Sequence, residues 1–217
     1  MASRKTTSAT GHERGSTTGA RRAANQRADA QRNRAKILAA VVTAIRKNPD
    51  ASVADIAAEA GVGRMTLYGH FSTRVELIEA ALVDSLERGE SVLADVPLDG
   101  DAAEAFSRLI GSSWVLLDHS RALLIAAQKE LPAARIREMH EASEARMRGL
   151  LERGQREGVF RRDLPVSWLL ATTHVVMNGA AEEITAGRLD PEDASRFIDA
   201  TLQPAFLVTA SDRGDGR

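Results

Sequence analysis

Hydrogen-bond donors crowd one short window of this sequence, and acids are missing from it. Between Gly61 and Val75 there is no aspartate or glutamate, although the whole chain has 30 acidic residues. The polar side chains of the window can all donate hydrogen bonds; they are Arg64, Thr66, Tyr68, His70, Ser72, Thr73 and Arg74. Donors without competing acids suit a surface that meets phosphates and the acceptor groups of base edges. The window therefore predicts contact with a nucleic acid.

Two short helices joined at a glycine would position these donors. Ser52, with Asp55 three residues later, has the pattern of a capping box at the start of a helix over about residues 52–60. Gly61 would end that helix, because glycine adopts positive φ without a steric penalty. A second short helix is predicted over residues 64–70. Such a pair is typical of a helix-turn-helix, whose second helix presents polar side chains to the major groove.

Apolar residues around the turn are suited to hold the two helices together. Ala57 is the small residue at which the helices would cross, and Ile56, Val62 and Leu67 would pin both of them to a third helix. That third helix is predicted over residues 29–47, where apolar residues recur on one face. These three helices together make a complete DNA-binding unit, which we call the reading unit.

The rest of the chain also has helical spacing, and strand-type alternation is absent. The sequence predicts an all-α fold of about nine helices, with an N-terminal three-helix helix-turn-helix domain and a C-terminal helical bundle. The predicted units are a disordered basic arm over residues 1–28, a DNA-binding domain over 29–92 and a second domain over 101–210. Thr73 is predicted to cap the next helix, with Glu76 as its paired acid. The helices after it are predicted over 101–118, 120–129, 132–157, 164–186 and 191–208, and Asp190 would cap the last of them, with Pro191 at its first position.

Charge is distributed unevenly along the chain, whose formal net charge is -1. Up to Lys36 there are nine basic and two acidic residues, a net +7, which leaves -8 for the remainder. The arm has almost no large apolar side chain, so burial cannot offset its ordering entropy. Arms of this kind can place arginine in a minor groove or along phosphates, and Arg27, Arg32 and Arg34 are the nearest candidates. A solvated tail that only aids solubility is the alternative.

The window from Arg34 to Leu82 resembles the TetR family of bacterial regulators. The matching segments are RAKILAA at 34–40, SVADIAAEAGV at 52–62 and TLYGHF at 66–71, followed by Arg74 and by Leu77 and Ile78. The resemblance covers the reading unit. The second domain matches the family only in length and helical layout.

The resemblance implies DNA contacts by the polar residues of this window. Ser52 would touch a phosphate, Arg64 and Thr66 would reach base edges or phosphates, and Tyr68 and His70 would contact backbone, base or both. Arg74 would meet a phosphate from the start of the fourth helix. Met65 departs from the family pattern and adds bulk beside the groove. With the two arginines of the arm, the predicted DNA-binding residues are Ser52, Arg64, Met65, Thr66, Tyr68, His70, Arg74, Arg34 and Arg32. A solvated role for Arg64 and a packing role for His70 are the alternatives.

The resemblance also implies that residues 101–210 sense a small-molecule ligand and form a homodimer through the last two helices. The helix over 164–186 is apolar around its circumference, so several of its sides must be buried. A partner subunit or a monomer core could bury them. A two-fold dimer predicts a near-palindromic operator in double-stranded DNA.

Composition alone indicates where a ligand would bind. Pockets are mostly apolar with a few convergent polar groups. His174 and Asn178 are four residues apart and share a face of an apolar helix. The ligand-pocket candidates are Trp114, His119, His140, Met147, Trp168, His174 and Asn178. Ordinary core or interface packing is the alternative for each of them.

Other classes of function lack their motifs. The segment beginning at His140 and Glu141 has no second histidine at metalloprotease spacing, and no phosphate loop, dinucleotide fingerprint or nucleophile elbow occurs. We therefore predict no enzyme, metal or cofactor, and with no cysteine and no signal peptide we expect a cytoplasmic protein. The predicted function is a transcriptional repressor released from its operator by a ligand. A ligand-independent regulator or an activator is the alternative.

Overall fold

The computed structural model describes the backbone of residues 14–208 and the side chains from Arg21 onward, except that of Ala23. Within this range the chain forms nine helices and no strand, which confirms the predicted all-α class. A two-residue bridge between Phe160 and Leu207 is the one β-type contact described there. The helices are α1 Arg14–Lys47, α2 Val53–Glu59, α3 Arg64–Tyr68, α4 Arg74–Ala94, α5 Ala102–Glu130, α6 Ala133–Met139, α7 Glu141–Glu157, α8 Val166–Thr185 and α9 Pro191–Phe206.

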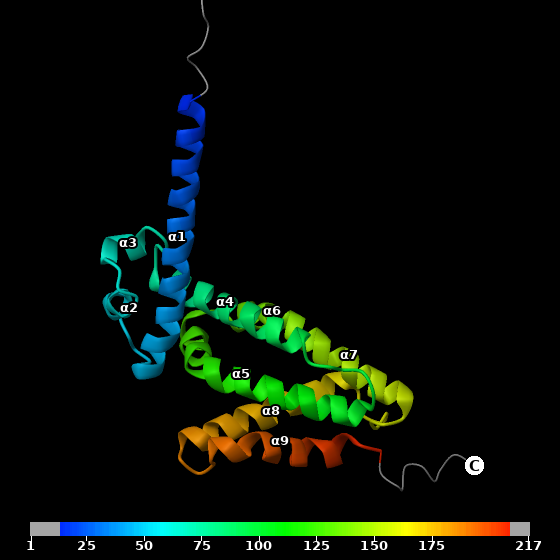
Figure 1. The fold of residues 1–217 in the computed structure, drawn as a ribbon. Helices are drawn as coiled ribbons and strands as arrows, with labels where there is room; N and C mark the ends of the chain where they lie inside the picture. Colours follow the sequence, from blue (N-terminus) through cyan, green and yellow to red (C-terminus); the bar gives the residue numbers. More distant parts are fainter. Residues whose placement is uncertain (1–13, 209–217) are drawn as a thin grey trace, which may run out of the picture.

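The first four helices surround one of the two hydrophobic cores. Figure 1 shows α2 and α3 on one side of α1 and α4 on the other. From α1 the buried residues include Ile37, Val41 and Ile45, which lie on one helical face as predicted. Leu67 of α3 packs into the same core and is fully buried. The core therefore fixes α3, the recognition helix of the predicted helix-turn-helix, beside α1.

The second core lies between α5, α7, α8 and α9. Three aromatic rings form its centre: Phe106 contacts Phe160 with ring centroids 5.7 Å apart and Phe206 with centroids 5.5 Å apart. An aspartate cap begins α9, with the Asp190 carboxylate accepting from the Glu192 backbone at 2.9 Å and a proline in the first turn. That start matches the prediction.

α5 belongs to both cores, which the sequence did not predict. Its first half contributes Phe106 and Leu109 to the second core. Its last turns contribute Leu123, Ala126 and Ala127 to the core of the helix-turn-helix half. The loop between α4 and α5 lies at the predicted domain boundary, but the packing crosses it, so the two halves are joined by a shared rigid element.

The predicted disordered arm is corrected over part of its length. α1 begins at Arg14 and continues without a break into the packed segment, so residues 14–28 are helical. Extending an existing helix needs no new nucleus, and alanine, arginine and glutamine are strong helix formers. Residues 1–13 of the predicted arm lie outside the described part of the chain.

Two further helix boundaries are also corrected. The predicted helices over 101–118 and 120–129 are one helix, because Ser120 does not break it and instead donates its hydroxyl to the Leu116 carbonyl at 2.8 Å. The predicted helix over 132–157 is divided into α6 and α7 at His140. There the backbone has φ -90° and ψ 0°, and the amide hydrogen-bonds to the carbonyls of Ile136 and Arg137.

Candidate DNA-binding surface and effector cavity

The turn between α2 and α3 has the geometry that its residues predict. The Ser52 hydroxyl oxygen accepts from the Asp55 backbone at 3.2 Å, and the Asp55 carboxylate accepts from the Ser52 backbone at 2.8 Å. The hydrogen bond from the Ser52 side chain, followed by that from its backbone, lowers the pKa of Asp55. Gly61 has φ +65°, and Val62 donates to the Ala57 carbonyl at 3.0 Å. The capping box and the glycine turn are therefore confirmed.

α3 presents its polar side chains to solvent. Leu67 points into the core, and Phe71, directly after the helix, is buried as well. The exposed side chains of α3 are Arg64, Met65, Thr66 and Tyr68. Met65 is 83% exposed, which is unusual for a large apolar residue and leaves it available to a groove or a thymine methyl group. All four predicted contacts on α3 therefore share an accessible surface.

His70 and Arg74 lie closer to the body than these four residues. The ring of His70 is half-buried and lies 6.4 Å from the Phe71 ring, centroid to centroid. Arg74 donates from Nε to the Ala51 carbonyl at 3.3 Å and forms an ion pair with Glu130 of α5. The guanidinium that we assigned to a phosphate is thus engaged within the protein, where it joins the start of α4 to α5.

The two predicted arginine contacts on α1 have different surroundings. Arg32 is exposed and forms an ion pair with Asp29. Arg34 lies over the Phe71 ring, 5.4 Å from guanidinium carbon to ring centroid. It also lines a shallow hollow with acidic residues of α4, namely Glu76, Glu79, Asp84 and Glu87. Arg34 therefore lies between the Phe71 ring and acidic residues of α4.

A cavity of about 580 Å³ lies between the two halves of the protein. α1 and α4 line it from the DNA-binding half, and α5, α7 and α8 line it from the other half. Leucines make much of its apolar wall: Leu86 and Leu93 of α4 and Leu116, Leu117 and Leu124 of α5. The volume and the apolar lining are typical of a small-molecule site.

Five of the seven predicted ligand-pocket residues line this cavity: His119, His140, Met147, His174 and Asn178. The two tryptophans do not. Trp114 is buried in the second core, and Trp168 is 59% exposed on the outside of α8. Both tryptophans were ligand-pocket candidates by composition alone, but Trp114 packs in the core and Trp168 points outward from α8.

The imidazoles give the cavity a polar wall. His140 Nδ1 lies 2.8 Å from the Ile136 carbonyl oxygen, which can only accept, so Nδ1 must carry a proton and Nε2 of the neutral ring is left as an acceptor. The pKa of His174 is lowered, chiefly because surrounding protein desolvates the imidazolium. A charged His140 would lower it further, whereas Glu144 opposes the shift. His174 is therefore neutral at pH 7 and can accept a hydrogen bond.

Residues of α1 and α4 complete the cavity, and sequence reasoning missed them. Ala39, Thr43 and Arg46 line it from the face of α1 opposite its buried stripe. Their spacing of four and three residues is helical, but small and polar residues on an outer face look like ordinary surface. Glu90 of α4 also lines it and forms an ion pair with Arg146. The lining emerges only when α5 and α7 pack across these helices.

Apolar side chains are exposed on the outer faces of α8 and α9. Trp168 and Val175, seven residues apart on α8, are 59% and 70% exposed, and Phe197 of α9 is 43% exposed. On the other side of α9, Ile198, Leu202 and Phe206 pack into the second core. In residues 14–208 no helix is long and apolar enough to cross a membrane, and no cluster of histidines and acids could hold a metal ion.

Comparison with known proteins agrees with this geometry. Residues 37–81 match the family model described as bacterial regulatory proteins of the tetR family. No curated protein sequence matches the chain. Among solved structures, a putative TetR-family regulator from Vibrio parahaemolyticus is 25% identical, with a TM-score of 0.61 over 82% of this chain and all of that one.

Two other solved structures have the same fold at lower identity. A TetR-family regulator from Marinobacter aquaeolei is 16% identical, with a TM-score of 0.65 over 85% of this chain and 100% of that one. FadR from Bacillus subtilis, solved in complex with stearoyl-CoA, is 21% identical, with a TM-score of 0.63 over 77% of this chain and 96% of that one. The helix-turn-helix match, the geometry of its turn and the shared fold together show that residues 37–81 form a DNA-binding helix-turn-helix of the TetR family of transcriptional regulators, which is not a family of enzymes, on a chain with the fold of such regulators.

Proposed function

We propose that the protein is a homodimeric repressor that leaves a near-palindromic operator when a small, largely apolar molecule enters the cavity. The observation that carries this proposal is the cavity wall, to which both halves of the protein contribute. A ligand there touches α1 and α4 of the helix-turn-helix half, α7 and α8 of the other half, and α5, which belongs to both. Its affinity must therefore depend on how the two halves sit against each other.

Direct contacts give the ligand a route to α3. α4 runs from the cavity to Thr73, whose hydroxyl oxygen accepts from the Glu76 backbone at 3.1 Å and so fixes the helix start beside α3. The Arg74–Glu130 ion pair joins that start to the end of α5. A ligand that separates α4 from α5 would move the start of α4, and with it the recognition helix. Operator binding would then weaken.

The outer faces of α8 and α9 support a two-fold dimer. Exposed Trp168, Val175 and Phe197 would be buried against the same residues of a partner subunit. Two recognition helices related by a two-fold axis could then read half-sites one helical turn apart. Changing Val175 to Arg would place a charge in this interface and should yield a monomer by analytical ultracentrifugation. Ile125→Arg, at a similarly exposed position on α5, is the matched control and should leave the dimer intact.

The cavity lining favours an effector with a long apolar part and at least one hydrogen-bond donor. The leucines would bury the apolar part, and Nε2 of His140 and the imidazole of His174 would accept from the donor. FadR of Bacillus subtilis binds stearoyl-CoA, so fatty acyl-CoA thioesters and long-chain alcohols are suitable first probes.

An activator is the second candidate function, and the operator position distinguishes it from a repressor. A repressor's operator overlaps the promoter, whereas an activator's lies upstream of it.

Reciprocal binding measurements test the proposal. The operator is first selected from random duplexes, and the dissociation constant of each probe is then measured with and without it. If a probe weakens operator binding, the operator must weaken probe binding by the same factor, about 5- to 150-fold for typical couplings. A probe that binds equally well in both conditions would contradict the mechanism. His174→Ala and Asn178→Ala should reduce the response, whereas Ser167→Ala, on α8 but outside the cavity lining, should not.

A further inference from the structure

The N-terminal part of α1 projects beyond the body of the protein. Figure 1 shows it continuing past α2 and α3 as a straight helix, and from Arg21 to Lys36 its described side chains are exposed or half-exposed. Ile37 is the first buried residue among the described side chains of the helix. We name residues 21–36 the basic extension. At 1.5 Å per residue it is roughly 24 Å long, which is about seven base pairs of duplex.

Positive charge dominates this extension. Its basic residues are Arg21, Arg22, Arg27, Arg32, Arg34 and Lys36, against the single acid Asp29. Asp29 pairs with Arg32, and α4 acids surround Arg34. Arg21, Arg22 and Arg27 are exposed and have no ion-pair partner among the residues that the structure describes. Three guanidinium groups are thus available to an anionic partner.

The extension is a poor helix by itself. It buries no apolar stripe, and α1 has no acid in its first turn, where a negative charge would stabilise the helix dipole. Helices without tertiary packing are marginal in water. Neutralising the arginines would remove their mutual repulsion, so an anionic partner would stabilise the helical form. The missing apolar face argues against a membrane surface, where interfacial helices bury large apolar residues.

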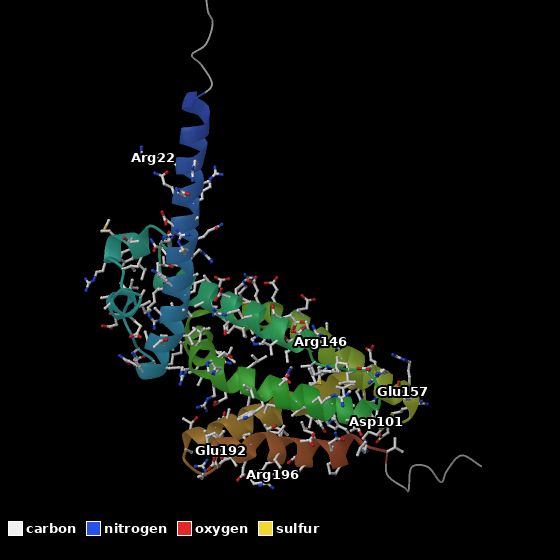
Figure 2. The ribbon with its side chains drawn as sticks, in the orientation of Figure 1. Arg22, Asp101, Arg146, Glu157, Glu192 and Arg196 are labelled. Atoms are coloured by element: carbon white, nitrogen blue, oxygen red, sulfur yellow. The ribbon has the colours of Figure 1, made fainter. Side chains whose placement is uncertain are left out.

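The position of the extension selects duplex DNA as that partner. In Figure 2, Arg22 projects from the side of α1 on which α2 and α3 lie. Gln26 follows Arg22 by four residues and Asn33 follows Gln26 by seven, so helical geometry places all three on one face. Amide and guanidinium donors on the side of the recognition helix fit a phosphate backbone. DNA that meets α3 would pass beside this face.

We infer that the basic extension is a second DNA-contacting element, a helical rod whose Arg22 binds a phosphate of the duplex next to the base pairs contacted by α3, while Arg21 and Arg27 reach neighbouring phosphates from the two flanks of that face. This inference deepens the proposed operator binding and rests on it. The contacts add affinity and length to the bound site without adding base preference, since phosphates are the same in every sequence. A rod also fixes where these contacts fall, which a flexible arm does not.

The test compares two double variants of the full-length protein with the same loss of charge. R21Q/R22Q removes two arginines from the extension, and R156Q/R162Q removes two near the end of α7, where Glu157 marks the part of Figure 2 farthest from α3. Binding to the selected operator and to random duplex is measured over a range of salt. R21Q/R22Q should flatten the plot of log affinity against log salt by about two units per subunit, equally for both duplexes. R156Q/R162Q should match the wild-type protein.

Hydroxyl-radical footprints on the operator distinguish a rod from a flexible arm. The wild-type protein should protect DNA beyond the base pairs in contact with α3, and R21Q/R22Q should lose that protection. Ala24→Pro keeps every charge but breaks the helix, and it should lose the protection too. Wild-type protection by Ala24→Pro would overturn the rod. Unchanged salt slopes and protection in R21Q/R22Q would overturn the DNA contact altogether.

Failure of the proposed function would give a different result. A wild-type protein that selects no operator refutes operator binding, while the salt slope on random duplex still reports whether the extension contacts DNA. Vesicles of phosphatidylglycerol and phosphatidylcholine test the other anionic partner. Wild-type binding to these vesicles that R21Q/R22Q abolishes, together with unchanged DNA binding, would assign the extension to membranes and overturn the inference.

Discussion

The two halves of this protein differ in how far local sequence determines their structure. In the helix-turn-helix half, single residues act on their neighbours: Ser52 caps α2, Gly61 turns the chain and Leu67 anchors α3. The cavity beside the second half arises only where helices distant in the sequence pack together, including α1 and α4 of the first half. DNA binding, which depends on one compact motif, can therefore be predicted from the sequence, whereas the effector site depends on the assembled fold.

The largest expected effect tests whether the two halves unfold together or independently. Phe106→Ala removes the ring that contacts both Phe160 and Phe206 and should lower the free energy of unfolding by about 3–5 kcal/mol. Leu123→Ala, in the other core, should cost about 2–5 kcal/mol. Because α5 serves both cores, calorimetry should show each variant shifting one common transition. Two transitions, with only one of them shifted by each variant, would show that the halves unfold independently.

A smaller effect separates DNA contact from stability. Arg64→Gln removes an exposed donor of α3 and should cost about 1–3 kcal/mol of operator binding if the guanidinium reads a base edge. Its melting temperature should stay at the wild-type value, since the side chain is exposed. Electrophoretic mobility shifts with the selected operator and with single-base variants of it provide the measurement. A uniform loss on every duplex would instead assign Arg64 to a phosphate.

The capping box tests how much one residue contributes to the motif. Ser52→Ala removes the acceptor of the Asp55 amide and should destabilise the protein by about 0.5–2 kcal/mol. Chemical denaturation measures the change. Ser167→Ala, an exposed serine at the start of α8 without a described cap bond, is the control and should change stability very little. Equal effects of the two substitutions would show that the cap contributes nothing.

The smallest effect concerns pH and the cavity. The folded protein lowers the pKa of His174, so the unfolded chain takes up that proton more readily. The contribution of His174 to stability is therefore complete above its ordinary pKa of about 6.5 and is lost as the pH falls through the lowered value. The stability difference between wild type and His174→Gln should change between these two pH values and be constant above them. A difference that is constant over the whole range would contradict the shift.

The accuracy of the sequence predictions follows the range of the interactions involved. The capping box, the glycine turn and the proline start of α9 depend on residues a few positions apart, and all three are confirmed. The sequence predicted a helix boundary before Ser120, where the helix continues because the serine hydroxyl bonds back to its own helix. It predicted no boundary at His140, where a tight turn divides the helical pattern. The phosphate contact of Arg74 stays a prediction, and its ion pair with Glu130, far along the chain, was not predicted. No local pattern contains that information.

The division of α5 between two cores has a practical consequence for building chimeric biosensors. A designer who exchanges sensor halves between regulators would naturally cut at the loop from Asp95 to Asp101, where the helices separate. That cut would remove Leu123, Ala126 and Ala127 from the reading unit and leave its interior open. A functional graft must instead keep the last turns of α5 with the host's α1 and α4, or redesign the surfaces that they fill. The unit of exchange in this protein is smaller than its apparent domain.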